Sequence, residues 1–303
     1  MRCASIAVYV LVALALLTIE TVTASADENI FAGRSIKLAE GRTPTATIVH
    51  GIGLKHAAVT LQAHLVGATS ITFPIAVDQQ VVQADRFDYQ DPWQKKTVIL
   101  VGNVENNRAF LKLYSRYLVG VNNAYPGAGL YVLRTLSDPL FAGADVVVVG
   151  GSDEAGLQAA MARFIALVSS STDDQGNCML RPLVEIGDAT ERISLDLGRA
   201  KDNFVGQSYK FFWTGDASAG RKAKRHLLAE VEKGADGLWE FEHGGHYHWE
   251  EHYRQLFQVL ASGVLSHEQT ATLDDRLYHV FTATEDSVGR SAVNATLNSS
   301  TKV

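Results

Sequence analysis

The chain has 303 residues, of which 27 are basic and 33 acidic, so its formal net charge is −6, and 47% of its residues are hydrophobic. This length accommodates one large domain or two small ones with a buried core. We identify no long run of basic residues. The acidic balance therefore argues against a nucleic-acid-binding face, and no nucleic-acid partner is expected.

The N-terminus has the pattern of a secretory signal peptide over residues 1–26. Arg2 supplies the positive charge, Ile6 to Leu17 is apolar, and the small residues Ala24-Ser25-Ala26 precede Asp27. The apolar run of about twelve residues is short beside the roughly 20 of a membrane span. We predict cleavage near Ala26 and a secreted or periplasmic protein, with an uncleaved anchor as the alternative. Cleavage leaves Cys178 as the single thiol, which excludes an intramolecular disulfide.

The first α/β unit is predicted to begin at residue 46, after a polar leading segment over residues 27–44. Ala46 to Val49 is a short strand, and the glycines of Gly51-Ile52-Gly53 follow it. A strand followed by glycines is also found in dinucleotide-binding proteins, but here the third glycine of that motif is replaced by His56. No nucleotide cofactor is therefore expected. The next helix has an apolar face made of Leu54, Ala57, Ala58, Leu61 and Leu65.

Two more strands are predicted before the middle of the chain. Ile71 to Val77 contains Pro74, which favours a sheet edge or a bulge. Thr97 to Val101 is strongly apolar, and Gly102-Asn103 leads from it into a helix. The side chains expected on the inner face of that helix are Phe110, Leu113, Tyr114 and Tyr117.

The clearest pattern lies between Leu130 and Val168. Leu130 to Leu136 is a β-prone run, and Asp145 to Val149 is a continuous apolar run typical of a strand buried on both faces. Because their connection is short, the two strands are expected to be adjacent. Gly150-Gly151 then turns the chain, and Ser152 or Asp153 is expected to cap a helix. That helix has an apolar face made of Leu157, Ala160, Met161, Phe164 and Val168.

These elements have the order β-α-β-β-α-β-β-α and predict a mixed-sheet α/β sandwich over residues 27–190. Ser169 to Gly176 is interpreted as a polar linker, and Leu183 to Ile186 as one more short strand. A helical region is predicted over residues 191–285, where helical periodicity begins near Ser218, and a disordered tail over residues 286–303.

Three helices are expected in the helical region, each with an apolar face. The last is expected to open with a capping box at Ser266-His267-Glu268-Gln269. The three faces are Ala223, Leu227, Leu228 and Val231; then Trp249, Tyr253, Leu256, Phe257 and Leu260; then Leu273, Leu277, Val280 and Phe281.

Three short stretches carry a resemblance to a known family: Val98 to Gly102, Tyr125 to Val132, and Val147 to Gly156. Together they resemble the non-catalytic α/β domain that precedes the barrel in α-glucuronidases and β-N-acetylhexosaminidases, over roughly residues 40–170. The chain is also similar to the front of large secreted bacterial proteins in which such a domain precedes an (α/α) toroid, and Tyr247 to Val280 resembles the start of those helices. Since the catalytic acids of these glycosidases lie on the barrel, the resemblance implies no catalytic residue in this chain.

One segment could carry chemistry. Four of the ten histidines lie between residues 243 and 252, and imidazoles with carboxylates are good ligands for zinc and similar ions. The candidate ligands of a divalent metal are His243, His246, His248, Glu250 and His252. The candidate sugar-stacking rings are Trp239, Tyr247 and Trp249. A third interpretation is a glycine-hinged loop and a polar helix start without either function.

We therefore expect a secreted accessory domain, non-catalytic, that binds or supports the processing of extracellular polysaccharide or oligosaccharide, either by itself or as a piece of a larger carbohydrate-active protein. In this interpretation no cofactor is required. One alternative is a metal-assisted glycoside hydrolase or polysaccharide lyase that uses the histidine segment. Another is a scaffold that binds a protein partner through the helical region.

Overall fold

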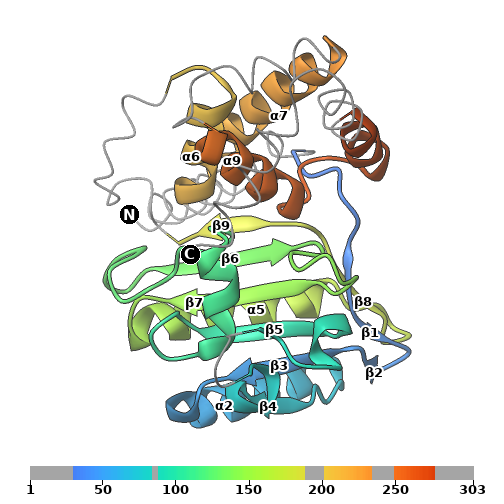
Figure 1. The fold of residues 1–303 in the computed structure, drawn as a ribbon. Helices are drawn as coiled ribbons and strands as arrows, with labels where there is room; N and C mark the ends of the chain where they lie inside the picture. The colour runs from blue at the N-terminus through green and yellow to red at the C-terminus, as the bar shows by residue number, and fades with distance from the viewer. Residues whose placement is uncertain (1–29, 84–87, 188–200, 234–248, 277–303) are drawn as a thin grey trace, which may run out of the picture. The chain divides into compact units, whose positions relative to one another are not determined.

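A six-stranded mixed sheet is the centre of the fold (Figure 1). The computed structural model describes residues 30–83, 88–187, 201–233 and 249–276, without the side chains of residues 249–253. From one edge of the sheet to the other the strands are β4 (Ile75–Val77), β3 (Ala46–His50), β5 (Thr97–Gly102), β7 (Val146–Gly151), β6 (Tyr131–Leu136) and β9 (Val184–Ile186).

The sheet has a parallel part and an antiparallel part. β4, β3, β5 and β7 run parallel, with Ile48 paired to Ile75 and to Ile99, and Val101 paired to Val149. β6 runs antiparallel to both β7 and β9. The predicted mixed α/β sandwich is therefore confirmed, as are the adjacent pair β6–β7 and the short last strand. β4 lies at the edge, as Pro74 indicated, and the strand begins directly after that proline because proline has no N–H for a ladder hydrogen bond.

Two helices cover one face of the sheet, α2 (Lys55–Thr69) and α5 (Glu154–Ser170) (Figure 1). The predicted apolar face of α5 is buried against the strands, and Asp153 caps the helix by accepting a hydrogen bond from the Gly156 N–H. Burying a large aliphatic or aromatic side chain contributes about 1.5–3 kcal/mol, so this face is a main source of stability. The central buried side chains of this layer are Ile48, Leu61, Leu65, Ile99, Phe164 and Val168.

The opposite face of the sheet is covered by short elements. They are α3 (Asp78–Val81), η2 (Trp93–Lys95), η3 (Arg108–Phe110) and α4 (Leu111–Ser115), while η1 (Ile52–Leu54) opens α2. Phe110 and Leu113 are buried here as predicted, but Tyr114 and Tyr117 are exposed, which corrects the prediction that they point inward. The reason is that α4 ends at Ser115, so the helical periodicity on which that prediction depended does not reach Tyr117.

A second, three-stranded sheet was not predicted. It consists of β2 (Thr43–Pro44), β1 (Ile36–Glu40) and β8 (Cys178–Leu180), all antiparallel. β1 lies in the segment interpreted as a polar leader, and Ile36 and Leu38 on it are fully buried. β1 and β8 are too short for an alternating pattern to be recognised in the sequence, and their core contacts come from residues distant in sequence.

The helical region contains α6 (Phe204–Thr214), α7 (Ala217–Glu232), α9 (Trp249–Ala261) and a further helical stretch over residues 267–276. α6 was not predicted. The capping box is confirmed, because the Gln269 N–H donates to Ser266 Oγ and the Ser266 N–H donates to Gln269 Oε1. Leu277, Val280 and Phe281 lie outside the described residues. None of the helices that the structure describes combines the length and the hydropathy of a membrane span.

Arg134 on β6 joins the sheet to α6. Its guanidinium donates to the carbonyl oxygens of Leu118 (3.3 Å) and Phe212 (2.5 Å) and lies 4.1 Å from the centre of the Phe212 ring. Desolvation lowers the pKa of Arg134 to about 10, so the guanidinium remains charged at neutral pH. The buried cation therefore fixes the start of the helical region on the sheet.

Candidate functional site

The carboxyl ends of the parallel strands are the first place to look for a site. Ligands of open α/β sheets bind in the crevice at this edge, where neighbouring strands continue to opposite faces of the sheet. Here β3 continues into α2 on one face, and β5 continues into η3 and α4 on the other. The gap between the ends of β3 and β5 is thus the expected ligand position.

In this protein the gap is filled by the chain itself. The buried Asn107 amide donates to Val49 O (3.0 Å) on β3 and to Val101 O (2.9 Å) on β5, and Asn107 Oδ1 accepts from the Ala109 N–H. A Cβ on Gly51 would lie 1.6 Å from the backbone oxygen of Asn106, so the loop after β5 lies directly on the end of β3. Asparagine and backbone atoms thus occupy the ligand position.

The neighbouring end of β7 is closed in a similar way. The buried Asn103 amide donates to Gly151 O (3.0 Å) and to Asn123 Oδ1 (3.0 Å). Asp153 accepts from the N–H groups of Gly156 and Gly129, and these backbone hydrogen bonds lower the pKa of its carboxyl. Asp153 therefore serves the helix N-terminus, as the sequence indicated.

The sequence-predicted site lies mostly outside the described residues. Trp239, His243, His246, Tyr247 and His248 all fall in residues 234–248. Trp249, Glu250 and His252 lie in the first turn of α9, where the backbone alone is described. Within the described parts of the chain, no three His, Cys, Asp or Glu side chains are grouped as a metal site would require. The divalent-metal and sugar-stacking interpretations of this segment stay predictions.

Exposed aromatic side chains gather where three segments meet. Phe141, in the connection from β6 to β7, is 69% exposed, and its ring lies edge-to-face on Phe257 of α9 at 5.9 Å between centroids. The Arg254 guanidinium lies 3.7 Å from the centre of the Tyr117 ring, and Gln258 Nε2 donates to Tyr117 O. We call Tyr117, Phe141, Phe257 and Arg254 the aromatic patch. Phe257 was predicted to point inward and instead is 42% exposed.

The backbone of the aromatic patch is strained. Tyr117 has φ 58° and Phe141 has φ 56°, in the left-handed region that bulky side chains rarely adopt. Each such residue costs of order 1–3 kcal/mol, and strain of this kind clusters at functional sites. The connection is held by Asp138, whose carboxylate accepts from the N–H groups of Ala142 and Gly143. The rings of Tyr117 and Phe141, both on backbone of positive φ, are thus exposed to solvent.

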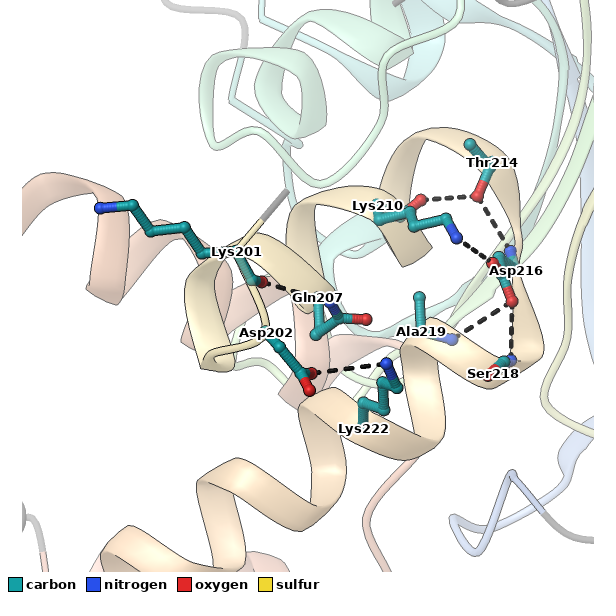
Figure 2. A network of polar contacts seen from close by, with 9 residues as sticks. All are labelled: Lys201, Asp202, Gln207, Lys210, Thr214, Asp216, Ser218, Ala219 and Lys222. Atoms are coloured by element: carbon teal, nitrogen blue, oxygen red, sulfur yellow. Dashed lines mark hydrogen bonds and ion pairs between the residues drawn. The ribbon is translucent and has the colours of Figure 1, made fainter. Parts of the chain in front are cut away.

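A polar network joins α6 to α7 (Figure 2). Asp216 caps α7 by accepting from the N–H groups of Ser218 and Ala219, and its carboxylate pairs with Lys210 at 2.6 Å. At the other end of the network, Asp202 lies 3.5 Å from Lys222 Nζ. These contacts place α7 firmly beside α6 with its outer face in solvent.

The outer face of α7 carries a cluster of positive charge that the sequence reasoning missed. The run from Arg221 to His226 holds four Lys or Arg residues and a histidine. Arg221 and Arg225 are exposed and form no ion pair within the described residues. Lys224 instead points inward and donates to Val264 O (2.9 Å), and desolvation lowers its pKa. The dense basic run was the signal that could have identified this face.

Helix stability does not account for these charges. Arg221 and Arg225 are four residues apart, and like charges at this spacing cost an isolated helix about 0.2–0.5 kcal/mol. Glu230 and Glu232 lie in the last turn, where the negative end of the helix dipole disfavours carboxylates by about 0.3–1 kcal/mol each at low salt. The Asp216 carboxylate at the N-terminus agrees with the helix dipole, whereas Glu230 and Glu232 at the C-terminal end oppose it.

Searches against protein-family models and curated proteins find no match to this chain.

Proposed function

We propose that this protein is a secreted, non-catalytic accessory module that binds extracellular polysaccharide through the aromatic patch. The observation that carries the proposal is the exposure of Phe141, Phe257 and Tyr117 together on strained and tightly held backbone. The strained backbone costs folding free energy, and more than a third of the surface of each of these three residues is exposed to solvent. Binding explains why this arrangement is present.

The chemistry of the patch suits a sugar chain. Aromatic faces carry partial negative charge, and they attract the polarised C–H groups that line one side of a pyranose ring. The guanidinium of Arg254 lies over the Tyr117 ring, and a guanidinium is a hydrogen-bond donor that suits the hydroxyl oxygens of a sugar. Rings together with a hydrogen-bond donor provide both stacking and orientation.

Two further points support a module without its own reaction. The ligand position of the parallel sheet is filled by Asn107 and by the loop after β5. The resemblance of residues 40–170 to the glycosidase accessory domain implies the same role, because in those enzymes the chemistry lies on another domain. The interpretation as an enzyme that uses the histidine segment remains the alternative.

The test is affinity electrophoresis and calorimetry with the full secreted chain against xylan, mixed-linkage glucan and chitin oligosaccharides. The variant Phe141→Ala/Phe257→Ala is expected to weaken binding at least roughly tenfold, as loss of interface anchors does. Ile52→Ala is the matched control, because Ile52 is 66% exposed and lies on η1, at a distance from the patch in sequence.

The proposal fails if the parent chain binds none of these polysaccharides. It also fails if the double variant binds as tightly as the parent while both melt at the same temperature. Loss of a protein partner from the double variant, without any glycan binding by the parent, would favour the scaffold alternative instead.

A further inference from the structure

We infer that the outer face of α7, formed by Arg221, Lys222 and Arg225, is a second binding surface and takes the carboxylate or sulfate groups of an acidic polysaccharide. The choice of a polysaccharide as the polymer rests on the proposed function. The assignment of an anion to this face rests on α7 alone.

The spacing of the charges matches a linear polyanion. Arg221 and Arg225 are four residues apart, which is about 6 Å along the helix axis. Both guanidinium groups are exposed, and each can bind a carboxylate or sulfate with two parallel N–H···O bonds. Anionic groups on a sugar chain recur at a similar interval, so two successive groups can be held at once.

The face is built on a fixed support. α7 is capped by Asp216, and the buried side of the helix packs through Ala219, Ala223 and Leu227. Lys224, the inward member of the basic run, donates to the carbonyl of Val264. The helix therefore cannot turn to hide its arginines without breaking these contacts, and the charges are preorganised.

The neighbouring acidic groups leave the face positive. Among the described residues, Asp202 is the carboxylate bonded to this side of α7. It lies 3.5 Å from Lys222 Nζ (Figure 2) and 3.4 Å from His226 Nε2. The hydrogen bond from His226, with the attraction of Lys222, lowers the pKa of Asp202. Glu230 and Glu232 lie at the opposite end of the helix, beyond the two arginines.

A polysaccharide is favoured over a nucleic acid because the whole chain carries a net charge of −6, which repels a densely charged duplex at long range. An acidic sugar chain has a lower charge density, and its uncharged rings can also reach aromatic side chains. Nucleic acid and anionic lipid are therefore competing outcomes in the test.

The experiment measures the dissociation constant of the full chain for polygalacturonate and for chondroitin sulfate, between about 50 and 200 mM salt. Arg221→Gln/Arg225→Gln is expected to weaken binding about tenfold at the lower salt and to flatten the dependence of log K on log salt. The control Lys55→Gln/Arg181→Gln removes the same charge from exposed positions elsewhere and is expected to change neither value. Melting temperatures of both variants check that the fold is kept.

Equal binding by the two double variants would overturn the inference, because net charge and not this face would then govern it. Tighter binding to a single-stranded oligonucleotide or to vesicles with anionic lipid than to either polysaccharide would overturn it as well. The aromatic-patch variant Phe141→Ala/Phe257→Ala separates the two proposals, since loss of neutral-glycan binding there leaves this inference untouched.

Discussion

Replacing Asn107 by alanine tests whether the carboxyl edge of the sheet is a filled position or a binding position. The side chain makes three buried hydrogen bonds: its amide donates to Val49 O at 3.0 Å and to Val101 O at 2.9 Å, and its oxygen accepts from the Ala109 N–H at 3.0 Å. With about 1 kcal/mol for each bond, the loss is about 3 kcal/mol. For a chain of this size that lowers the melting temperature by about 6–12 °C.

The assay is urea unfolding followed by circular dichroism, in which the midpoint should fall while the slope m stays constant. Asn106→Ala is the control. Asn106 is exposed and its side chain accepts a single bond, from the Asn103 N–H, so less than about 1 kcal/mol should be lost. A loss below about 1 kcal/mol for Asn107→Ala would refute our reasoning, because it would mean that the gap between β3 and β5 is open to water or to a ligand.

Three further predictions concern single positions in the α/β part. Gly156→Ala should destabilise the fold by about 1–3 kcal/mol, because its Cβ would lie 2.1 Å from Leu130 O. A Cβ on Gly67 meets nothing within 4 Å, so Gly67→Ala should stabilise the fold by about 0.4–1 kcal/mol. The two variants should therefore shift the urea midpoint in opposite directions. Desolvation raises the pKa of the Glu185 carboxyl, but hydrogen bonds from Arg163 and Tyr131 outweigh it, so the net pKa lies below the ordinary 4.5. Its stabilisation is therefore present above pH 4.5 and lost as the pH falls through the lower folded value. Glu185→Gln should lower the urea midpoint at pH 7, and the difference from the parent should shrink as the pH is lowered below 4.5. Burial raises the pKa of the Cys178 thiol, which should react with an alkylating reagent after unfolding and not before; labelling in native buffer, located by mass spectrometry, would contradict this.

The sequence predicted the central sheet well because its strands are nearly continuous apolar runs. β5 and β7 are buried on both faces, and such runs need no partner to be recognised. β1 and β8 were missed because each is three to five residues long and gains its apolar contacts from the other end of the domain. α6 was missed although Asn203 caps it and Gly215 ends it with φ 69°. Five of its residues are aromatic, and two of them, Tyr209 and Trp213, lie off the buried face, so the sequence shows no single apolar stripe.

The candidate sites were harder to predict than the fold. The spacing of Phe257 matches the inner face of α9 and predicts a core position. The exposure of the ring depends on the segment that faces it, and here only Phe141 packs edge-to-face on Phe257 among the rings of the described residues. The sequence pattern predicts Tyr117 on the inner face of a helix, but that helix ends at Ser115. The basic face of α7 needed no structure to be found, since its signal is the local run from Arg221 to His226, which the negative net charge obscured.

The pairing of β1 with β8 joins residues about 140 positions apart, as in the register of Ile36 with Leu180. A chain that emerges N-terminus first, from a ribosome or through an export channel, must therefore keep β1 without its partner until β8 has also emerged. Contacts of such long sequence separation form late and slowly. We expect folding to begin at β6, β7 and α5, which lie close together in sequence. The three-stranded sheet is expected to form last.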